Sequence, residues 1–301
     1  KGVAAGRPSA SFLSKVQMRR TVFILGLPQN GATLVIMEEM DFPKYDGVPD
    51  SIDGVTFEEI YELFAGSPYG EILRQRVRYG PYKPEELSNE EWVRILGPDV
   101  NNLEHLKTTL AVANDFIYLA RHPHPEWPFG EVEFSREEEE LLCLTAVIHD
   151  WGEAVVGDIL WHRKTSDIDA EKEFAALNKI IKELCHPRYE RLLMEKIYLA
   201  ADIAFLKGDN ALNQVFNVIE HIGYANNVFR AWKERLKHDG LVLQVLSGIA
   251  KKLTGDHLAT WQRHSKFYPA THYQLLENEK VLAEILAADI NWRDVPILAN
   301  N

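Results

Sequence analysis

The chain has 301 residues, of which 46% are hydrophobic and 26% are charged, so one large domain with appendages can bury an ordinary core. Asp and Glu outnumber Lys and Arg by 45 to 33, which gives a formal net charge of −12. This acidic balance disfavours a nucleic-acid polymer as partner, because affinity for such a polymer depends on basic residues that neutralise phosphates. It leaves room for a small phosphorylated metabolite in a local pocket.

Cysteine usage and hydropathy indicate the compartment. Only Cys143 and Cys185 occur, and they do not form a CxxC pair. We therefore expect no disulfide framework, and a reducing cytoplasm is the predicted location. No apolar stretch approaches the ~20 residues that span a bilayer, so no membrane partner is expected. The basic opening segment lacks the apolar region of a secretory signal and is expected to be a flexible leader.

The N-terminal region, residues 1–85, is expected to be an extension of the main body. Two β-rich runs, 21–27 and 32–37, flank an Asn-Gly dipeptide, which predicts a β-hairpin. The same stretch partly resembles a phosphate-binding P-loop, but alanine stands where that motif needs its lysine, so the hairpin is favoured. The rest of the region is rich in Pro, Gly, Asp and Tyr, with one short helical stretch around 57–64.

From about Glu85 onward the apolar residues recur at helical spacing, which predicts an all-α body. Residues 86–236 are expected to form the domain that carries the chemistry, and 237–301 a C-terminal helical extension packed on it. Three prolines within residues 122–128 predict a loop, because proline breaks a helix interior. The expected helices are 89–96, 102–121, 135–152, 169–185, 189–207, 210–236, 240–253 and 271–288.

The most informative run is LTAVIHDWGEAVVGDI, in which a histidine and an aspartate end an apolar stretch. On a continuous helix, His149 and Glu153 share one face, and Asp150 lies about 100° round from His149. Gly157 can end the helix and leave Asp158 free to turn back toward the same point. Imidazole and carboxylate together suit divalent metals, and carboxylates beside a buried helix are costly without a compensating cation. Although a lone His-Asp pair is more often a surface pair, this run predicts metal-assisted hydrolysis.

A metal site needs further ligands from distant helices. His105 lies at the start of the expected helix 102–121, and a histidine there can point into a bundle core. Asp202 is the one carboxylate in the otherwise apolar run 197–206 of an expected helix, where it is costly without a partner. Both residues are therefore candidates for the missing ligands.

The order of these candidates along the chain resembles the H…HD…D arrangement of the HD-domain metal-dependent phosphohydrolases. The string HDWGEAVVGD is similar to the HDxxE…GD pattern of the 5′-deoxynucleotidase branch, which cleaves nucleoside monophosphates. The resemblance covers about residues 88–225. It implies an HD-domain helical bundle and one divalent ion (Mn, Co, Mg, Zn or Fe), held by His105, His149, Asp150 and Asp202.

The resemblance also implies roles for other residues. Glu153 would orient or deprotonate a metal-activated water, and Asp158 would assist proton transfer to the leaving 5′-oxygen or hold the sugar. Arg94 would pair with the phosphate. Trp92 would lie beside the sugar or base, or serve only as a core anchor. The expected activity is thus removal of phosphate from a nucleotide or another small phosphorylated metabolite, and a homodimer is compatible with it.

Three other interpretations stay open. One is a different HD enzyme, a nucleotide pyrophosphohydrolase, although that branch typically has an aspartate where this chain has Ala154. A second is a di-iron oxygenase, which needs extra histidines, and His162 and His186 lie in the right interval. The third is a non-catalytic nucleotide-binding regulatory module. Residues 106–109, which depart from the family pattern, and the extra terminal segments leave the substrate open.

Overall fold

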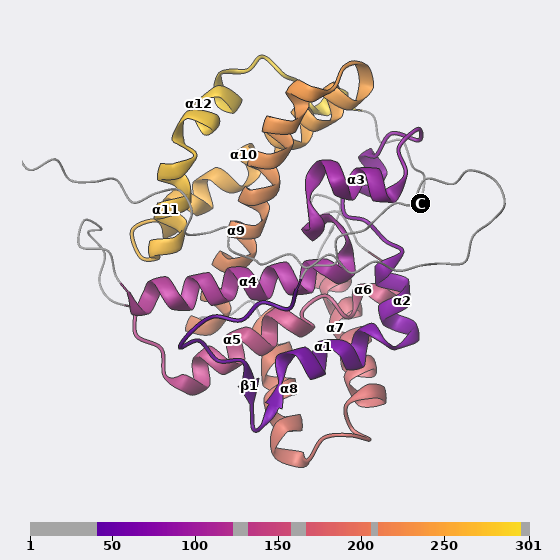
Figure 1. The fold of residues 1–301 in the computed structure, drawn as a ribbon, viewed down its shortest axis with the longest axis vertical. Helices are drawn as coiled ribbons and strands as arrows, with labels where there is room; N and C mark the ends of the chain where they lie inside the picture. The colour runs from indigo at the N-terminus through magenta and orange to yellow at the C-terminus, as the bar shows by residue number, and fades with distance from the viewer. Residues whose placement is uncertain (1–40, 123–131, 158–166, 206–209, 296–301) are drawn as a thin grey trace, which may run out of the picture.

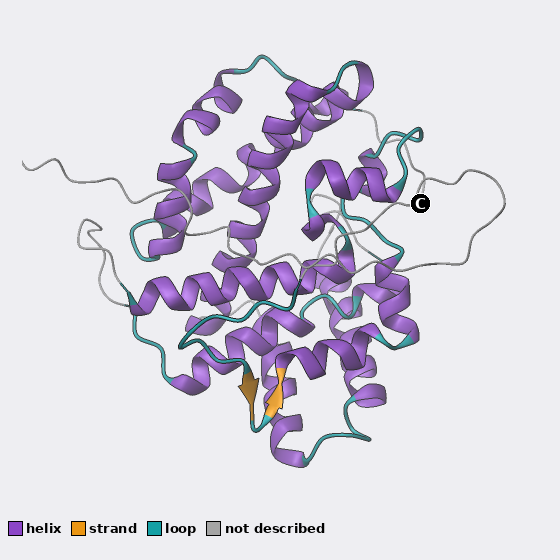
Figure 2. Ribbon diagram, viewed as in Figure 1, coloured by secondary structure: helices purple, strands orange, loops and turns teal. Residues whose placement is uncertain are grey.

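The protein is described by a computed structural model covering residues 41–122, 132–157, 167–205 and 210–295 (Figure 1). Within these ranges the chain is mostly helical (Figure 2), which confirms the expected all-α class. The hairpin expected at 21–37 lies outside the described residues. A small antiparallel sheet occurs instead at β1 (Ser51–Ile52) and β2 (Val55–Thr56), where the sequence had not indicated one. None of the helices in these ranges is both long enough and apolar enough to cross a membrane.

The described part of the chain consists of helices joined mostly by short connections. The helices are α1 (Phe57–Ala65), α2 (Pro68–Arg74), α3 (Asn89–Leu96), α4 (Asn102–Arg121), α5 (Arg136–Ile148), α6 (Glu153–Val156), α7 (Asp167–Leu184), α8 (Arg191–Phe205), α9 (Ala211–Glu234), α10 (Gly240–His264), α11 (Pro269–Glu277) and α12 (Glu279–Ala287). Helices α3 and α4 have the expected bounds. Helix α10 runs past its expected end at 253, and the single helix expected at 271–288 is two, α11 and α12, which meet at Asn278.

Side-chain caps fix where the helices around the site begin. Ser88 caps α3 and Ser135 caps α5, each in a capping box with a glutamate three residues later. The side chain of Asn101 accepts hydrogen bonds from the backbone N–H groups of Leu103 and Glu104, which satisfies donors at the start of α4. The first turn of α4 therefore carries His105.

The end of α5 differs from expectation. The apolar run predicts a helix to residue 152, but α5 ends at Ile148, and residues 149–152 form a turn before the short helix α6. Gly157 ends α6 with a φ of 88°, in the left-handed region that favours glycine, as expected. His149 and Glu153 are thus not on one continuous helix, and each lies close to Asp150 instead.

Two clusters of buried apolar side chains hold the helices together. The first core lies among α1, α4, α5, α7, α8 and the first half of α9, and the second among α3, the second half of α9 and α10. In Figure 1, α4 runs across the middle of the molecule, with α1, α5 and α8 on one side and α3, α10 and α12 on the other. Helix α9 belongs to both cores, and Gly223 and Tyr224 fall between its two core segments.

Candidate metal centre

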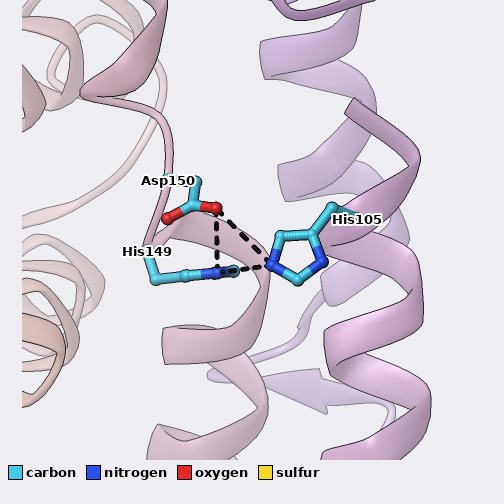
Figure 3. Close-up of side chains that lie close together, drawn as sticks. All are labelled: His105, His149 and Asp150. Atoms are coloured by element: carbon cyan, nitrogen blue, oxygen red, sulfur yellow. Dashed lines mark hydrogen bonds and ion pairs between the residues drawn. The ribbon is translucent and has the colours of Figure 1, made fainter. Parts of the chain in front are cut away.

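Three of the four expected metal ligands meet in one buried cluster (Figure 3). His105 comes from the first turn of α4, and His149 and Asp150 from the turn after α5. Nε2 of His105 lies 3.4 Å from Nε2 of His149 and 3.5 Å from Oδ2 of Asp150. Nε2 of His149 lies 3.3 Å from the same carboxylate oxygen. Two imidazole nitrogens and one carboxylate oxygen therefore form a nearly equilateral triangle.

A backbone hydrogen bond orients the second histidine. Nδ1 of His149 lies 3.0 Å from the carbonyl oxygen of Ala146, to which it donates as the N–H nitrogen. In the neutral imidazole this assigns the lone pair to Nε2, the nitrogen that faces the cluster. Metal-binding histidines are commonly held in this way through their other ring nitrogen.

The spacing of the three atoms suits a divalent ion. Ligand atoms bound at about 2.0–2.1 Å in a tetrahedral site lie about 3.3–3.4 Å from one another. The observed separations of 3.3–3.5 Å match this value. The donor set also matches, since imidazole nitrogen and carboxylate oxygen bind zinc and other first-row divalent ions. The residues therefore fit a metal, with at least one coordination position left over.

The charge states of the cluster are set by burial and by its neighbours. Burial and the nearby Arg78 guanidinium lower the pKa of His105 well below its ordinary value. Burial disfavours the charge on His149, but Asp150, Glu220 and the Ala146 carbonyl together outweigh it and raise the pKa of that imidazole. Burial would raise the pKa of Asp150, yet the surrounding positive groups, His149 foremost, lower it. The Asp150 carboxylate is therefore ionised and the His105 imidazole neutral, whereas His149 holds its proton more tightly and has to release it before its Nε2 can bind a cation.

Arg78 is the residue that the sequence did not indicate. Its Nη1 lies 2.8 Å from Nε2 of His105, and its guanidinium carbon lies 5.1 Å from the ring centre of Tyr224 on α9. Arg78 sits in the connection between α2 and α3, in the run RQRVRYG, where helical spacing offers no clue to its position. A permanent positive charge thus borders the cluster.

A second group of acidic side chains shares Asp150 with the first. Carboxylate oxygens of Asp150, Glu153 and Glu173 lie within 4.8 Å of one another. Nδ2 of Asn102 donates to Oε2 of Glu153 at 2.9 Å, and Arg76 donates to the Glu153 backbone carbonyl. The cluster therefore has an imidazole side and a carboxylate side.

Glu173 could have been recognised from the sequence. It lies on α7 at helical spacing from Leu177 and Ile180, which are fully buried, and its own side chain is 3% exposed. A carboxylate on such an apolar stripe is costly without compensation, which is the argument that was applied to Asp202.

The other expected site residues lie apart from the cluster or outside the described chain. Asp202 lies on α8, half-buried, and burial raises its pKa. It belongs to neither group formed by the described residues, so its role as fourth ligand stays a prediction. Asp158 lies outside the described residues, and so does His162. His186 is exposed, and its Nε2 is hydrogen-bonded to the Tyr198 hydroxyl at 2.9 Å.

The two expected substrate-binding residues occupy different environments. Trp92 is fully buried in the second core, and its Nε1 donates to the Arg78 carbonyl at 3.1 Å. This placement favours the anchor role, because the indole holds the backbone of Arg78. Arg94 is exposed on α3. Arg78, and not Arg94, contacts the imidazole side of the cluster.

Comparison with known proteins gives no family for this chain. No family model matches the sequence, and no curated protein and no solved structure matches it.

Proposed function

We propose that the protein is a metal-dependent phosphohydrolase that removes the phosphate from a nucleoside 5′-monophosphate. The HD-type order of the motif residues supports this assignment, together with the metal-compatible spacing of His105, His149 and Asp150. The fold is proposed to be an HD-domain bundle with additional helices after α9, acting in the cytoplasm.

The observation that carries the proposal is the position of Arg78. Its guanidinium lies within hydrogen-bonding distance of His105, so it would stand next to a bound divalent ion. Two cations in such a partly buried site repel each other unless an anion lies between them. A phosphate group satisfies both, because it binds a metal ion and accepts paired hydrogen bonds from a guanidinium.

The residues around the phosphate would then each have a different role in the reaction. A divalent ion bound at the cluster would act as a Lewis acid and lower the pKa of water. Arg78 would hold the phosphate and neutralise the charge that develops on it. Glu153 would orient the attacking water and accept its proton, while the hydrogen bond from Asn102 keeps the carboxylate in place. Asp158 remains the proposed group for the leaving oxygen.

Phosphate release tests the proposal directly. The purified protein is incubated with nucleoside and deoxynucleoside 5′-monophosphates in the presence of Mn²⁺, Co²⁺, Mg²⁺, Zn²⁺ or Fe²⁺. We expect phosphate release with at least one ion and none after treatment with a chelator. No release with any ion or substrate overturns the proposed activity.

A matched pair of variants tests the role of Arg78. Arg78→Lys keeps the charge but loses the forked geometry, so KM should rise and kcat/KM should fall by about 10-fold or more. Arg94→Lys, on the exposed face of α3, should leave both constants unchanged. Equal effects of the two substitutions would remove Arg78 from the phosphate site.

A further inference from the structure

A short antiparallel pairing ties the connection between α2 and α3 to the start of α4. Val77 pairs with Asn101 in an isolated bridge. Next to this bridge, the Asn102 backbone N–H donates to the Arg76 carbonyl at 3.2 Å. Arg76 therefore lies directly opposite Asn102, which is the first residue of α4.

Two alternate side chains of this connection reach the two sides of the cluster. Successive side chains of an extended segment point to opposite faces, so Arg76 and Arg78 share the face that Val77 does not occupy. Nη1 of Arg78 lies 2.8 Å from Nε2 of His105. The Arg76 guanidinium instead donates to the backbone carbonyl of Glu153, through Nη1. One extended segment thus contacts the imidazole side and the carboxylate side.

The opposed pair of Arg76 and Asn102 holds Glu153 at two points. Nδ2 of Asn102 donates to Oε2 of Glu153 at 2.9 Å, while Arg76 binds the carbonyl of the same residue. That carbonyl also accepts the Gly157 N–H at 2.8 Å, and its two lone pairs allow both bonds. The Glu153 side chain is 7% exposed, so water competes little for these donors.

Helix α6 does not hold Glu153 in place without contacts from other elements. It is a single turn, and its N-cap residue Gly152 provides no side-chain hydrogen bond. A helix this short is unstable in water without tertiary contacts. Hydrogen bonds from a charged donor are stronger than those between neutral groups, which makes Arg76 an effective anchor for the turn.

We propose that Arg76 is a positioning residue for the general base. It fixes the backbone of Glu153 while Asn102 fixes the carboxylate, so that the carboxylate faces the attacking water. This inference rests on the proposed function, since it concerns the group that accepts a proton from that water. Arg76 touches no substrate atom in this role, and Arg78 binds the phosphate.

Substitution of Arg76 tests the inference through the separation of kcat from KM. Arg76→Met keeps an unbranched side chain but loses every donor. We expect kcat to fall by at least about tenfold with KM changed by less than about twofold, because a misplaced catalytic group slows chemistry and leaves phosphate binding intact. Arg76→Lys keeps a charged donor, should recover part of kcat, and serves if the methionine variant does not fold.

The matched control is Arg74→Met in the same connection. Nη2 of Arg74 also donates to a backbone carbonyl, that of Ala65 at 3.1 Å, but Ala65 ends α1 and contributes no ligand. The Arg74 carbonyl still accepts from Asn101 after the substitution. Both constants should stay unchanged in this variant.

Three kinetic results overturn the inference and leave the proposed function standing. A rise in KM with unchanged kcat would make Arg76 a phosphate ligand. Unchanged constants would show that Glu153 is positioned without it. Equal losses in Arg76→Met and Arg74→Met would indicate a general loss of structure.

Hydrogen exchange keeps the two proposals distinguishable. If the unaltered protein releases no phosphate from any substrate, the proposed function fails, and amide exchange over residues 150–157 still tests the anchoring of Glu153. Exchange there should be faster in Arg76→Met than in the unaltered protein or Arg74→Met, because exchange reports local opening. Equal exchange in all three proteins overturns the inference.

Discussion

A side chain at Gly152 has no room, because its Cβ would lie 2.4 Å from the backbone carbonyl oxygen of Glu173. The backbone of α7 thus packs directly against the backbone of the turn after α5. The approach brings the Glu173 carboxylate to within 4.8 Å of those of Asp150 and Glu153. A glycine in the motif therefore sets how close a separate helix comes to the cluster of His149 and Asp150.

Gly152→Ala should destabilise the protein. The added methyl group forces the turn and α7 apart, and overpacking of this kind costs about 1–3 kcal/mol of unfolding free energy. Denaturant unfolding measures the loss. The control is Gly255→Ala, where the new methyl meets nothing and the change should be neutral or stabilising by about 0.5–1 kcal/mol. Two variants of equal stability would show that the close approach is not rigid.

His149→Ala should abolish metal retention. Removal of one of three convergent donors weakens binding, and a ligand that binds only the folded state stabilises it by mass action. Metal content after dialysis should fall. The rise in the thermal unfolding midpoint on addition of metal should fall as well. His186→Ala is the control, since that histidine is exposed and bonded to Tyr198. Full metal content in the His149 variant would place the ion elsewhere.

The helix boundaries that the sequence predicted best are those with local signals. Helices α3 and α4 begin at the strong caps Ser88 and Asn101, and both have the expected bounds. The end of α5 could not be predicted in this way, because no local stop signal precedes Gly152 and the chain already turns at 149–152, where it meets α7. Helix α10 continues through the exposed Gly255, where packing on α9 outweighs the low helix propensity of glycine.

The site could be predicted from the sequence to about the same extent as the helix boundaries. His105, His149 and Asp150 each carry a signal in their own segment, and they meet in the structure. Arg78 lies in an irregular connection, so only the three-dimensional fold brings it to His105. Asp202 carries the same kind of signal but belongs to neither group of candidate ligands among the described residues, so its role as a ligand stays a prediction.

Asp115 should give the protein a pH-dependent stability that is unrelated to the candidate metal site. Burial raises the pKa of this carboxyl to about 7, against a smaller opposing effect of its hydrogen bond with Tyr45. The folded state therefore binds the proton more tightly than the unfolded state, whose aspartates titrate near pH ~4. The resulting stabilisation is complete below that pH and is lost as the pH rises toward 7.

The variant Asp115→Asn isolates this contribution. Asparagine cannot titrate but keeps an acceptor for the Tyr45 hydroxyl. The difference in unfolding free energy between the unaltered protein and the variant should shrink steadily between pH 4 and pH 7. Urea unfolding at several pH values measures it. Parallel stability curves for the two proteins would contradict the raised pKa.

Glu153→Gln should separate catalysis from metal binding. Glutamine has nearly the same shape and can still accept the hydrogen bond from Asn102, so the fold should be retained. It cannot accept a proton from water, and loss of a general base lowers turnover by roughly 10²–10⁴. Phosphate release and metal content are measured on the same sample, with the exposed Glu195→Gln as the control. Metal lost together with activity would make Glu153 a ligand on the carboxylate side of the cluster. Full activity would remove it from catalysis.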